Sequence, residues 1–263
     1  MKEFFGIGGY LREPEGYLSW QHLTFVTSLM IIMIGLAVFF GIKNKQKDFE
    51  TKNKVLIWAS ILMVGFETIK ILVTFLDARY EETVKGWWHG SLPLYLCSIQ
   101  LIAIPLATFS RGKVKNAAMD FVFIFGLLGA VLGTYAAGQN YSSYPVLSFT
   151  NVVSGITHSI SGFCALYIGI SGMTSMKNKE LPITFGILSL FFILAFVANK
   201  TLGTNYMFIV RGDGTPYDIV YNLVKGNKVL YPASVYLLFV IYIVLFRTIF
   251  MKCKNAKLTK ANA

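Results

Sequence analysis

The sequence has few cysteines and few charged residues, and each shortage excludes some classes of protein. Its three cysteines lie far apart and form no Cys-x-x-Cys pair, so we expect neither a disulfide framework nor a zinc site. No cofactor-binding or metalloprotease motif occurs, so neither a cofactor nor a metal ion is expected. Charged residues make up only 14% of the chain and hydrophobic residues 55%, which favours a membrane protein over a soluble domain.

Long polar linkers are also missing, and the hydrophobic residues gather in runs of about twenty, the length that crosses the hydrocarbon core of a bilayer. Because backbone polar groups in lipid must be paired within their own segment, each run predicts a helix. We therefore expect an all-α, multi-pass membrane protein with seven transmembrane helices in a single domain, residues 1–263. The predicted spans are 20–42, 55–75, 91–110, 116–137, 148–172, 181–198 and 231–250.

Acidic residues are scarce, with 13 Asp and Glu against 24 Lys and Arg, which gives a net charge of +11. With seven spans, fifteen of the basic residues fall in loops on one side of the membrane and eight in loops on the other. Cytoplasmic loops keep an excess of Lys and Arg, so the amino terminus is predicted outside and the carboxy terminus inside. The excess charge then faces anionic lipid, and nucleic acid is not an expected partner.

Ionisable residues inside the predicted spans are candidates for function, because charge is costly in lipid. Glu67 and Lys70 lie three residues apart on one helix face, so they form either a structural ion pair or part of a ligand site. Asp120 lies near the inner end of its span and is expected to reach toward water. His158 lies about ten residues into its span, near the bilayer midplane, where it either makes an interhelical hydrogen bond or transfers protons.

The stretch SLPLYLCS, residues 91–98, places a proline and a cysteine in one apolar span. The proline removes a helix hydrogen bond and opens the backbone near Cys97, while Gln100 adds a polar group one turn later. A cysteine in an apolar span is commonly a packing residue, as we expect for Cys164. Next to a base such as His158, however, a thiolate can attack an acyl carbon. The residues alone leave both interpretations of Cys97 open.

Three classes of function fit these features: a lipid-modifying enzyme, a transporter or ligand-binding protein, and a structural scaffold. A transporter would be supported by inverted repeats with broken helices, which the sequence does not show. The segment GAVLG, residues 129–133, is a Gly-x-x-x-Gly motif and predicts close packing of two helices. An enzyme needs only one pocket that reaches the lipid, so we favour an enzyme, with a transporter or lipid-binding protein as the alternative.

Four motifs follow one another along the chain: the glutamate of GFETIK, SLPLYLCS, the Tyr144–Pro145 pair that precedes His158, and GTNYMF at residues 203–208. Together they resemble the bacterial YwaF-like family of integral membrane proteins, whose pattern includes LPLHLC and a late NYMF. The histidine of that first pattern is Tyr95 in this chain. The family is distantly similar to a eukaryotic seven-span acyltransferase that remodels ether phospholipids.

The resemblance implies a catalytic pair, a lipid substrate and a location. Carried over by position, Cys97 is the nucleophile that holds an acyl thioester, and His158 is its general base. The implied partner is a membrane phospholipid or another acyl-chain lipid, and the implied location is the bacterial cytoplasmic (plasma) membrane. The expected substrate-binding residues, around one outward-opening cavity, are Glu67, Lys70, Tyr95, Gln100, Tyr144, Asn205 and Tyr206.

Overall fold

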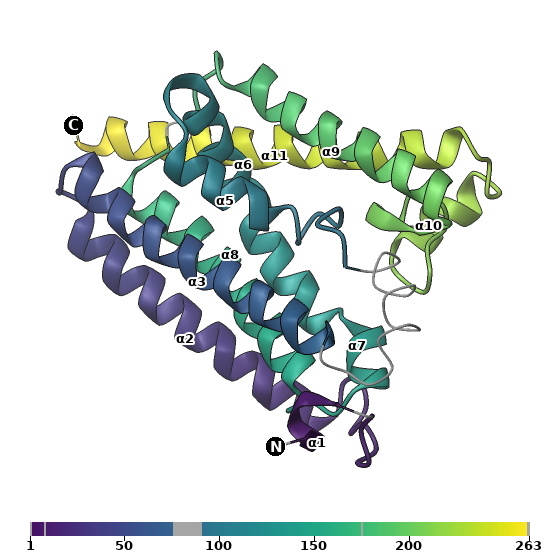
Figure 1. Ribbon diagram of the computed structural model, residues 1–263. Helices are drawn as coiled ribbons and strands as arrows, with labels where there is room; N and C mark the ends of the chain where they lie inside the picture. The colour runs from purple at the N-terminus through teal and green to yellow at the C-terminus, as the bar shows by residue number, and fades with distance from the viewer. Residues whose placement is uncertain (1, 8, 76–90, 175, 262–263) are drawn as a thin grey trace. The chain divides into compact units, whose positions relative to one another are not determined.

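The computed structural model describes residues 2–7, 9–75, 91–174 and 176–261. The chain forms two compact units, Met1–Ser175 and Met176–Ala263. The first unit contains α1 (Lys2–Phe5), α2 (Trp20–Asn44), α3 (Phe49–Phe75), α5 (Gln100–Phe109), α6 (Gly112–Tyr135), α7 (Gly138–Ser143) and α8 (Phe149–Ser171) (Figure 1). The second contains α9 (Leu181–Leu202), the 3₁₀ turn η1 (Tyr206–Phe208), α10 (Tyr217–Leu223) and α11 (Leu230–Ala261).

Six helices in the described part of the chain are long and apolar enough to cross a bilayer. They are α2, α3, α6, α8, α9 and α11. Their flanks expose large apolar side chains such as Ile31, Trp58 and Ile193, as lipid-facing surfaces do. The prediction of an all-α, multi-pass membrane protein is therefore confirmed.

The predicted span 91–110 differs from the structure, because only Gln100–Phe109 is helical and residues 92–99 form turns. Two local causes account for this late start. Pro93 disfavours helical backbone at the residue before it. The Ser98 hydroxyl accepts a hydrogen bond from Tyr95 N–H at 3.0 Å and lies 3.1 Å from Tyr95 O, which competes with helix formation. At ten residues, α5 is too short to cross a bilayer by itself.

The helices α6 and α8 form the centre of the first unit. Helix α8 also contacts α2 and α3, and α5 packs against α3 and α6. Glycine allows the close approach of α6 to α8, since a Cβ on Gly126 would lie 2.8 Å from the backbone oxygen of Ser161. The Ser161 hydroxyl donates to Gly126 O at 3.2 Å, which ties the two backbones together.

Polar bonds mark the two ends of this unit. At one end, which we call the basic end, Asn44 Nδ2 donates to the Tyr167 hydroxyl at 3.1 Å, and Lys115 Nζ donates to Thr108 O at 3.2 Å. At the opposite end, which we call the amino-terminal end, His22 of α2 bonds to Thr134 O of α6. Helices α2, α5 and α8 therefore end at the basic end, whereas α6 begins there.

Asp120 does not reach toward water as expected. It is only 4% exposed, and its carboxylate accepts a hydrogen bond from the Thr174 hydroxyl. The carboxylate lies in the interior because the segment after α8 supplies this donor, a partner that sequence spacing does not reveal.

The second unit is held together by polar and aromatic contacts between its helices. The Ser189 hydroxyl of α9 lies 2.7 Å from the Tyr236 hydroxyl of α11, and the Tyr231 hydroxyl donates to Phe208 O at 2.7 Å. Arg247 of α11 bonds to Met176 O and to Asn178 at the start of the unit. These bonds fix α11 to α9 and to the η1 turn.

Candidate functional site

The side chains of Cys97 and His158 lie close enough to each other for the thiol and the imidazole to interact. Cys97 lies in the turns before α5, and His158 lies in the middle of α8. Helix α5 places Cys97 about 15 Å from the basic end, and His158 precedes Tyr167 by nine residues, or about 14 Å of helix. Both residues keep part of their surface accessible. The pair therefore lies at mid-depth in the bundle.

Backbone geometry selects the tautomer of His158. Its Nδ1 atom lies 2.7 Å from the backbone oxygen of Ser154, one turn earlier on α8. A carbonyl oxygen can only accept, so Nδ1 must carry the proton and donate it. The neutral imidazole then has its lone pair on Nε2, which is the nitrogen free to accept the proton of the Cys97 thiol.

Two glycines of α6 make room for this pair. A Cβ on Gly129 would lie 3.3 Å from both Cα and Cβ of Cys97. A Cβ on Gly133, one turn further along, would overlap Cδ2 and Nε2 of His158. The Gly129–Gly133 motif was interpreted as a helix-packing motif, and here its glycines lie against the two candidate catalytic residues.

The start of α5 provides the polar surroundings of the sulfur. The backbone N–H groups of Cys97 and Ser98 lie close enough to the Cys97 sulfur to act on it. The first N–H groups of a helix lack helical acceptors and carry partial positive charge. A thiolate in this place is stabilised by these N–H groups together with a protonated histidine.

Glu67 and Lys70 form an ion pair on α3, with Lys70 Nζ 2.7 Å from Glu67 Oε1. Their side chains are 14% and 26% exposed, so the pair is partly shielded from solvent. The Lys70 ammonium is close enough to His158 for its charge to act on the imidazole. Helix α3 thus brings a charged pair to the same region as the cysteine and the histidine.

Gln100 is completely buried, one turn after Cys97. In the part of the chain that the structure describes, neither its amide nitrogen nor its amide oxygen has a hydrogen-bond partner. Tyr95, which occupies the histidine position of the related pattern, is half-buried and is fixed through its backbone by Ser98. Tyr95 therefore belongs to the turns that carry Cys97, and Gln100 is the first residue of the helix that follows them.

A pocket of about 610 Å³ lies at the amino-terminal end of the first unit. Of the residues expected to bind substrate, Tyr144 lines it. Its walls also include Thr74 of α3 and Thr150 of α8, which lie one turn beyond Lys70 and two turns before His158 along their helices. The same faces of α3 and α8 thus continue from the pocket to the cysteine–histidine pair.

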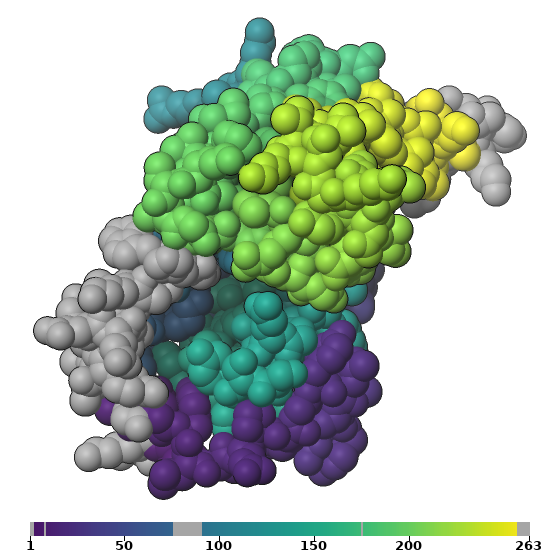
Figure 2. All heavy atoms as spheres, turned by 90° about the vertical axis from the view of Figure 1, so that its right-hand side faces the viewer, coloured from purple at the N-terminus to yellow at the C-terminus, as the bar shows by residue number. Residues whose placement is uncertain are grey.

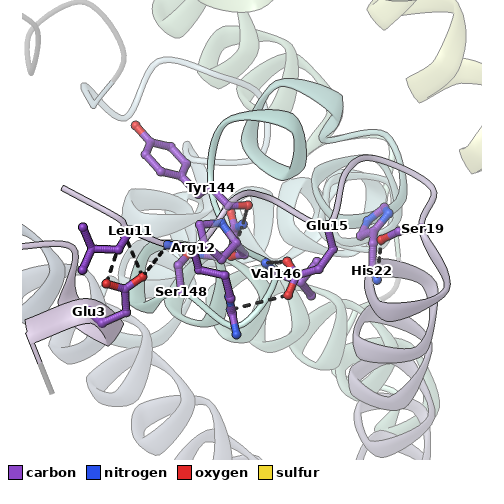
Figure 3. A network of polar contacts seen from close by, with 11 residues as sticks. Glu3, Leu11, Arg12, Glu15, Ser19, His22, Tyr144, Val146 and Ser148 are labelled. Carbon is purple, nitrogen blue, oxygen red and sulfur yellow. Dashed lines mark hydrogen bonds and ion pairs between the residues drawn. The ribbon is translucent and has the colours of Figure 1, made fainter.

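The segment before α2 forms the rim of this pocket. The Glu3 carboxylate accepts hydrogen bonds from the N–H groups of Leu11 and Arg12, and Glu15 accepts one from Val146 N–H at 2.7 Å (Figure 3). These N–H donors, Arg12 first, hold the pKa of Glu3 below its usual value. Burial alone would raise the pKa of Glu15, but the Val146 bond and the nearby Arg12 lower it. Figure 2 shows this segment, in purple, against the teal surface of the chain.

Asn205 and Tyr206 belong to the second unit, where their polar groups are used internally. Asn205 Nδ2 donates to Arg211 O and to Asp213, both at 2.8 Å. Tyr206 N–H donates to the amide oxygen of Asn199 at 2.6 Å. This network holds residues 211–213 in place, and the expectation that Asn205 and Tyr206 border the lipid cavity stays a prediction.

Another histidine, His22, belongs to no motif that the sequence singles out, and it is not exposed at all. Its Nδ1 accepts a hydrogen bond from Leu18 N–H at 3.2 Å, so Nε2 carries the proton and donates to Thr134 O at 3.1 Å. The Tyr141 ring lies over it, with ring centroids 3.9 Å apart. With both nitrogens bonded to backbone, His22 joins α2 to α6 and has no lone pair left for proton transfer.

Among the described residues, no three His, Cys, Asp or Glu side chains gather to hold a metal ion.

The model of the TMEM164 family matches residues 17–252, which include every helix from α2 to most of α11. The chain belongs to the TMEM164 family. This family, which is similar to eukaryotic ether-lipid acyltransferases, indicates a membrane protein that modifies lipids by acyl transfer. The YwaF-like name stays a resemblance, and none of the curated proteins or solved structures compared with the chain matches it.

Proposed function

We propose that this protein is a membrane lipid acyltransferase in which Cys97 is the nucleophile and His158 is the general base. The main support is the closeness of these two side chains, together with the Ser154 carbonyl that keeps the lone pair of His158 on Nε2. Family membership supports the same class of reaction. A thiol beside an oriented base is the arrangement that nucleophilic acyl transfer requires.

The reaction has two halves. In the first, the Cys97 thiol gives its proton to His158 Nε2, and its sulfur attacks the carbonyl carbon of a phospholipid ester. The tetrahedral intermediate expels the lipid oxygen, which takes the proton from His158 and leaves as a lysolipid alcohol. In the second, His158 removes the proton of an acceptor hydroxyl, the oxygen attacks the thioester, and the Cys97 thiolate leaves and recovers the proton.

The remaining site residues have binding roles in this proposal. The lipid head group occupies the pocket beside Tyr144, and its acyl ester reaches down the shared faces of α3 and α8. The Glu67–Lys70 ion pair interacts with the polar part of the lipid, and Tyr95 packs beside it. For Asn205 and Tyr206, a role in substrate binding stays a prediction. The turns at 92–99 and α5 together form the third of seven passes. The protein lies in the bacterial cytoplasmic membrane, with the amino terminus outside.

Acyl transfer between phospholipids tests the function directly. Purified protein in lipid nanodiscs would receive a phospholipid with a labelled acyl chain and an unlabelled lysophospholipid. We expect labelled product from the native protein, and at least about a hundredfold less from Cys97→Ser or His158→Gln. Cys164→Ala is the matched control, because Cys164 is fully buried in α8 and is expected to act only in packing. Equal turnover in Cys97→Ser would exclude the mechanism.

The alternative is a protein that binds or moves lipid without covalent chemistry. The 610 Å³ pocket favours this alternative as much as it favours the acyltransferase. In that case the native protein would bind labelled phospholipid without forming product. Binding would also be equal in the native protein and in Cys97→Ser.

A further inference from the structure

Gln100 is an unusual buried residue because both ends of its carboxamide are unpaired. Asn53 and Asn151 also carry an unpaired buried oxygen, but their amide nitrogens donate to backbone carbonyls. Gln100 has no such bond within the described residues, although it is 0% exposed. An unpaired buried polar group costs about 1–3 kcal/mol, so buried polar side chains generally have partners. A polar ligand at this place would supply one.

The position of Gln100 indicates where that ligand lies. Its backbone N–H donates to Cys97 O at 3.3 Å, so the two residues are joined by the first turn of α5. Side chains three residues apart in such a turn share a face, and helical side chains lean toward the amino-terminal end of their helix. Gln100 therefore lies one turn from Cys97, and a carboxamide that leans toward the amino-terminal end of α5 leans toward the turn that carries the thiol.

We propose that the Gln100 amide nitrogen donates a hydrogen bond to the carbonyl oxygen of the acyl group bound at Cys97. This inference rests on the proposed function and names the chemical group recognised, a carboxylic ester or thioester carbonyl. When the Cys97 sulfur bonds to the carbonyl carbon, the π electron pair moves to the carbonyl oxygen, which becomes an oxyanion. The Gln100 amide stabilises that charge, and the pair returns to the carbonyl when the leaving oxygen departs with the proton from His158.

This arrangement places the donor where charge develops in the reaction. Donors fixed in a water-poor site need little reorganisation at the moment of attack, and loss of one typically lowers turnover by about 10²–10³-fold. The side chain is fixed because Gln100 lies on a helix and is fully enclosed. The carboxamide that is unpaired without substrate is then part of the substrate site.

Gln100→Met tests the proposal, since methionine has a similar shape and no polar atoms. Three quantities would be measured in nanodiscs: the rate of Cys97 acylation by a labelled phospholipid, the rate of Cys97 alkylation by iodoacetamide, and the melting temperature. We expect acylation to fall about a hundredfold or more, alkylation to stay within about twofold, and the melting temperature to stay equal or rise. Alkylation has no oxyanion, so it reports the Cys97–His158 pair alone.

Gln139→Met is the control, because Gln139 is an exposed glutamine on α7. Gln100→Leu provides a second apolar variant in case Gln100→Met does not fold. If the native protein shows no acylation, the proposed function fails. If it does, and the Gln100 variants acylate at the native rate, only the role of Gln100 fails. A parallel fall in acylation and alkylation, or a lower melting temperature that explains the loss, would make Gln100 a structural residue that binds at most a water molecule.

Discussion

At the scale of single residues, the sequence singles out candidate catalytic side chains but does not show how they pack together. Cys97 and His158 stand out because each is a reactive residue in an apolar span. Their contact depends on Gly129 and Gly133, which lie on a third helix and whose spacing indicates only close packing. The tautomer of His158 depends on a backbone carbonyl, which no side-chain motif encodes. These details require the packed structure.

Gly133→Ala tests whether the space beside Gly133 is needed to hold the His158 imidazole in position. The added methyl group would overlap the imidazole, so the ring must leave the position in which it meets Cys97. We expect the iodoacetamide reaction of Cys97 to slow by about tenfold or more, because the thiolate loses its base. Gly35→Ala on α2 is the control, since a Cβ there meets nothing within 4 Å. Native alkylation in Gly133→Ala would show that the glycine has no effect on the pair.

The second buried histidine has the opposite role, and His22→Leu separates the two. This substitution removes the partner of Leu18 N–H and of the buried Thr134 carbonyl, and the unpaired carbonyl alone costs about 1–3 kcal/mol. We therefore expect a clearly lower melting temperature, with Cys97 alkylation in the folded protein unchanged. A melting temperature equal to that of the native protein would contradict this structural role.

At the scale of elements, the hydrophobic pattern predicts most helices to within a few residues. The expected spans 20–42 and 148–172 correspond closely to α2 (Trp20–Asn44) and α8 (Phe149–Ser171). The expectation for 91–110 does not, because hydropathy ignores the local bonds of Ser98 and the restriction imposed by Pro93. The turns that result place Cys97 at the start of a helix rather than within one.

The segment before α2 gives a prediction for pH. The pKa of Glu15 is lowered in the folded protein, so its contribution to stability is present above its unfolded pKa, about 4.3. That contribution is lost as the pH falls through the lower folded value. Amide exchange of Val146, corrected for intrinsic rate, should therefore be slow at pH 7 and accelerate below about pH 4.

Glu15→Gln is the matched variant, because it removes the charge and keeps the shape. Val146 exchange in this variant should already be faster at pH 7 and should change little between pH 7 and pH 3. A steep increase in Val146 exchange at low pH in the Glu15→Gln protein, equal to that of the native protein, would mean that another group controls the exchange of Val146.

At the scale of the whole molecule, composition is sufficient to predict an all-α, multi-pass membrane protein. Its division into units of residues 1–175 and 176–263 has no signal in hydropathy, because both units consist of the same kind of helix. The membrane orientation rests on the distribution of Lys and Arg. Within the first unit, Lys52, Lys54, Lys113 and Lys115 lie at the starts of α3 and α6, near the Asn44 and Thr108 contacts of the basic end.

Cys253 is a native reporter of that orientation, since it is exposed near the end of α11. With the carboxy terminus inside, a membrane-impermeant maleimide should label Cys253 only after the cells are permeabilised. A Cys97→Ala, Cys164→Ala background restricts the label to this residue. Labelling of Cys253 in intact cells would contradict the proposed topology.

The central claim is that Cys97 carries the acyl group. The most direct measurement is mass spectrometry of the purified protein after incubation with phospholipids that bear a labelled acyl chain. We predict a hydroxylamine-sensitive acyl adduct on the peptide that contains Cys97, present in Cys164→Ala and absent in Cys97→Ala. Absence of the adduct in the native protein with every class of phospholipid, or an adduct that persists in Cys97→Ala, would contradict the account.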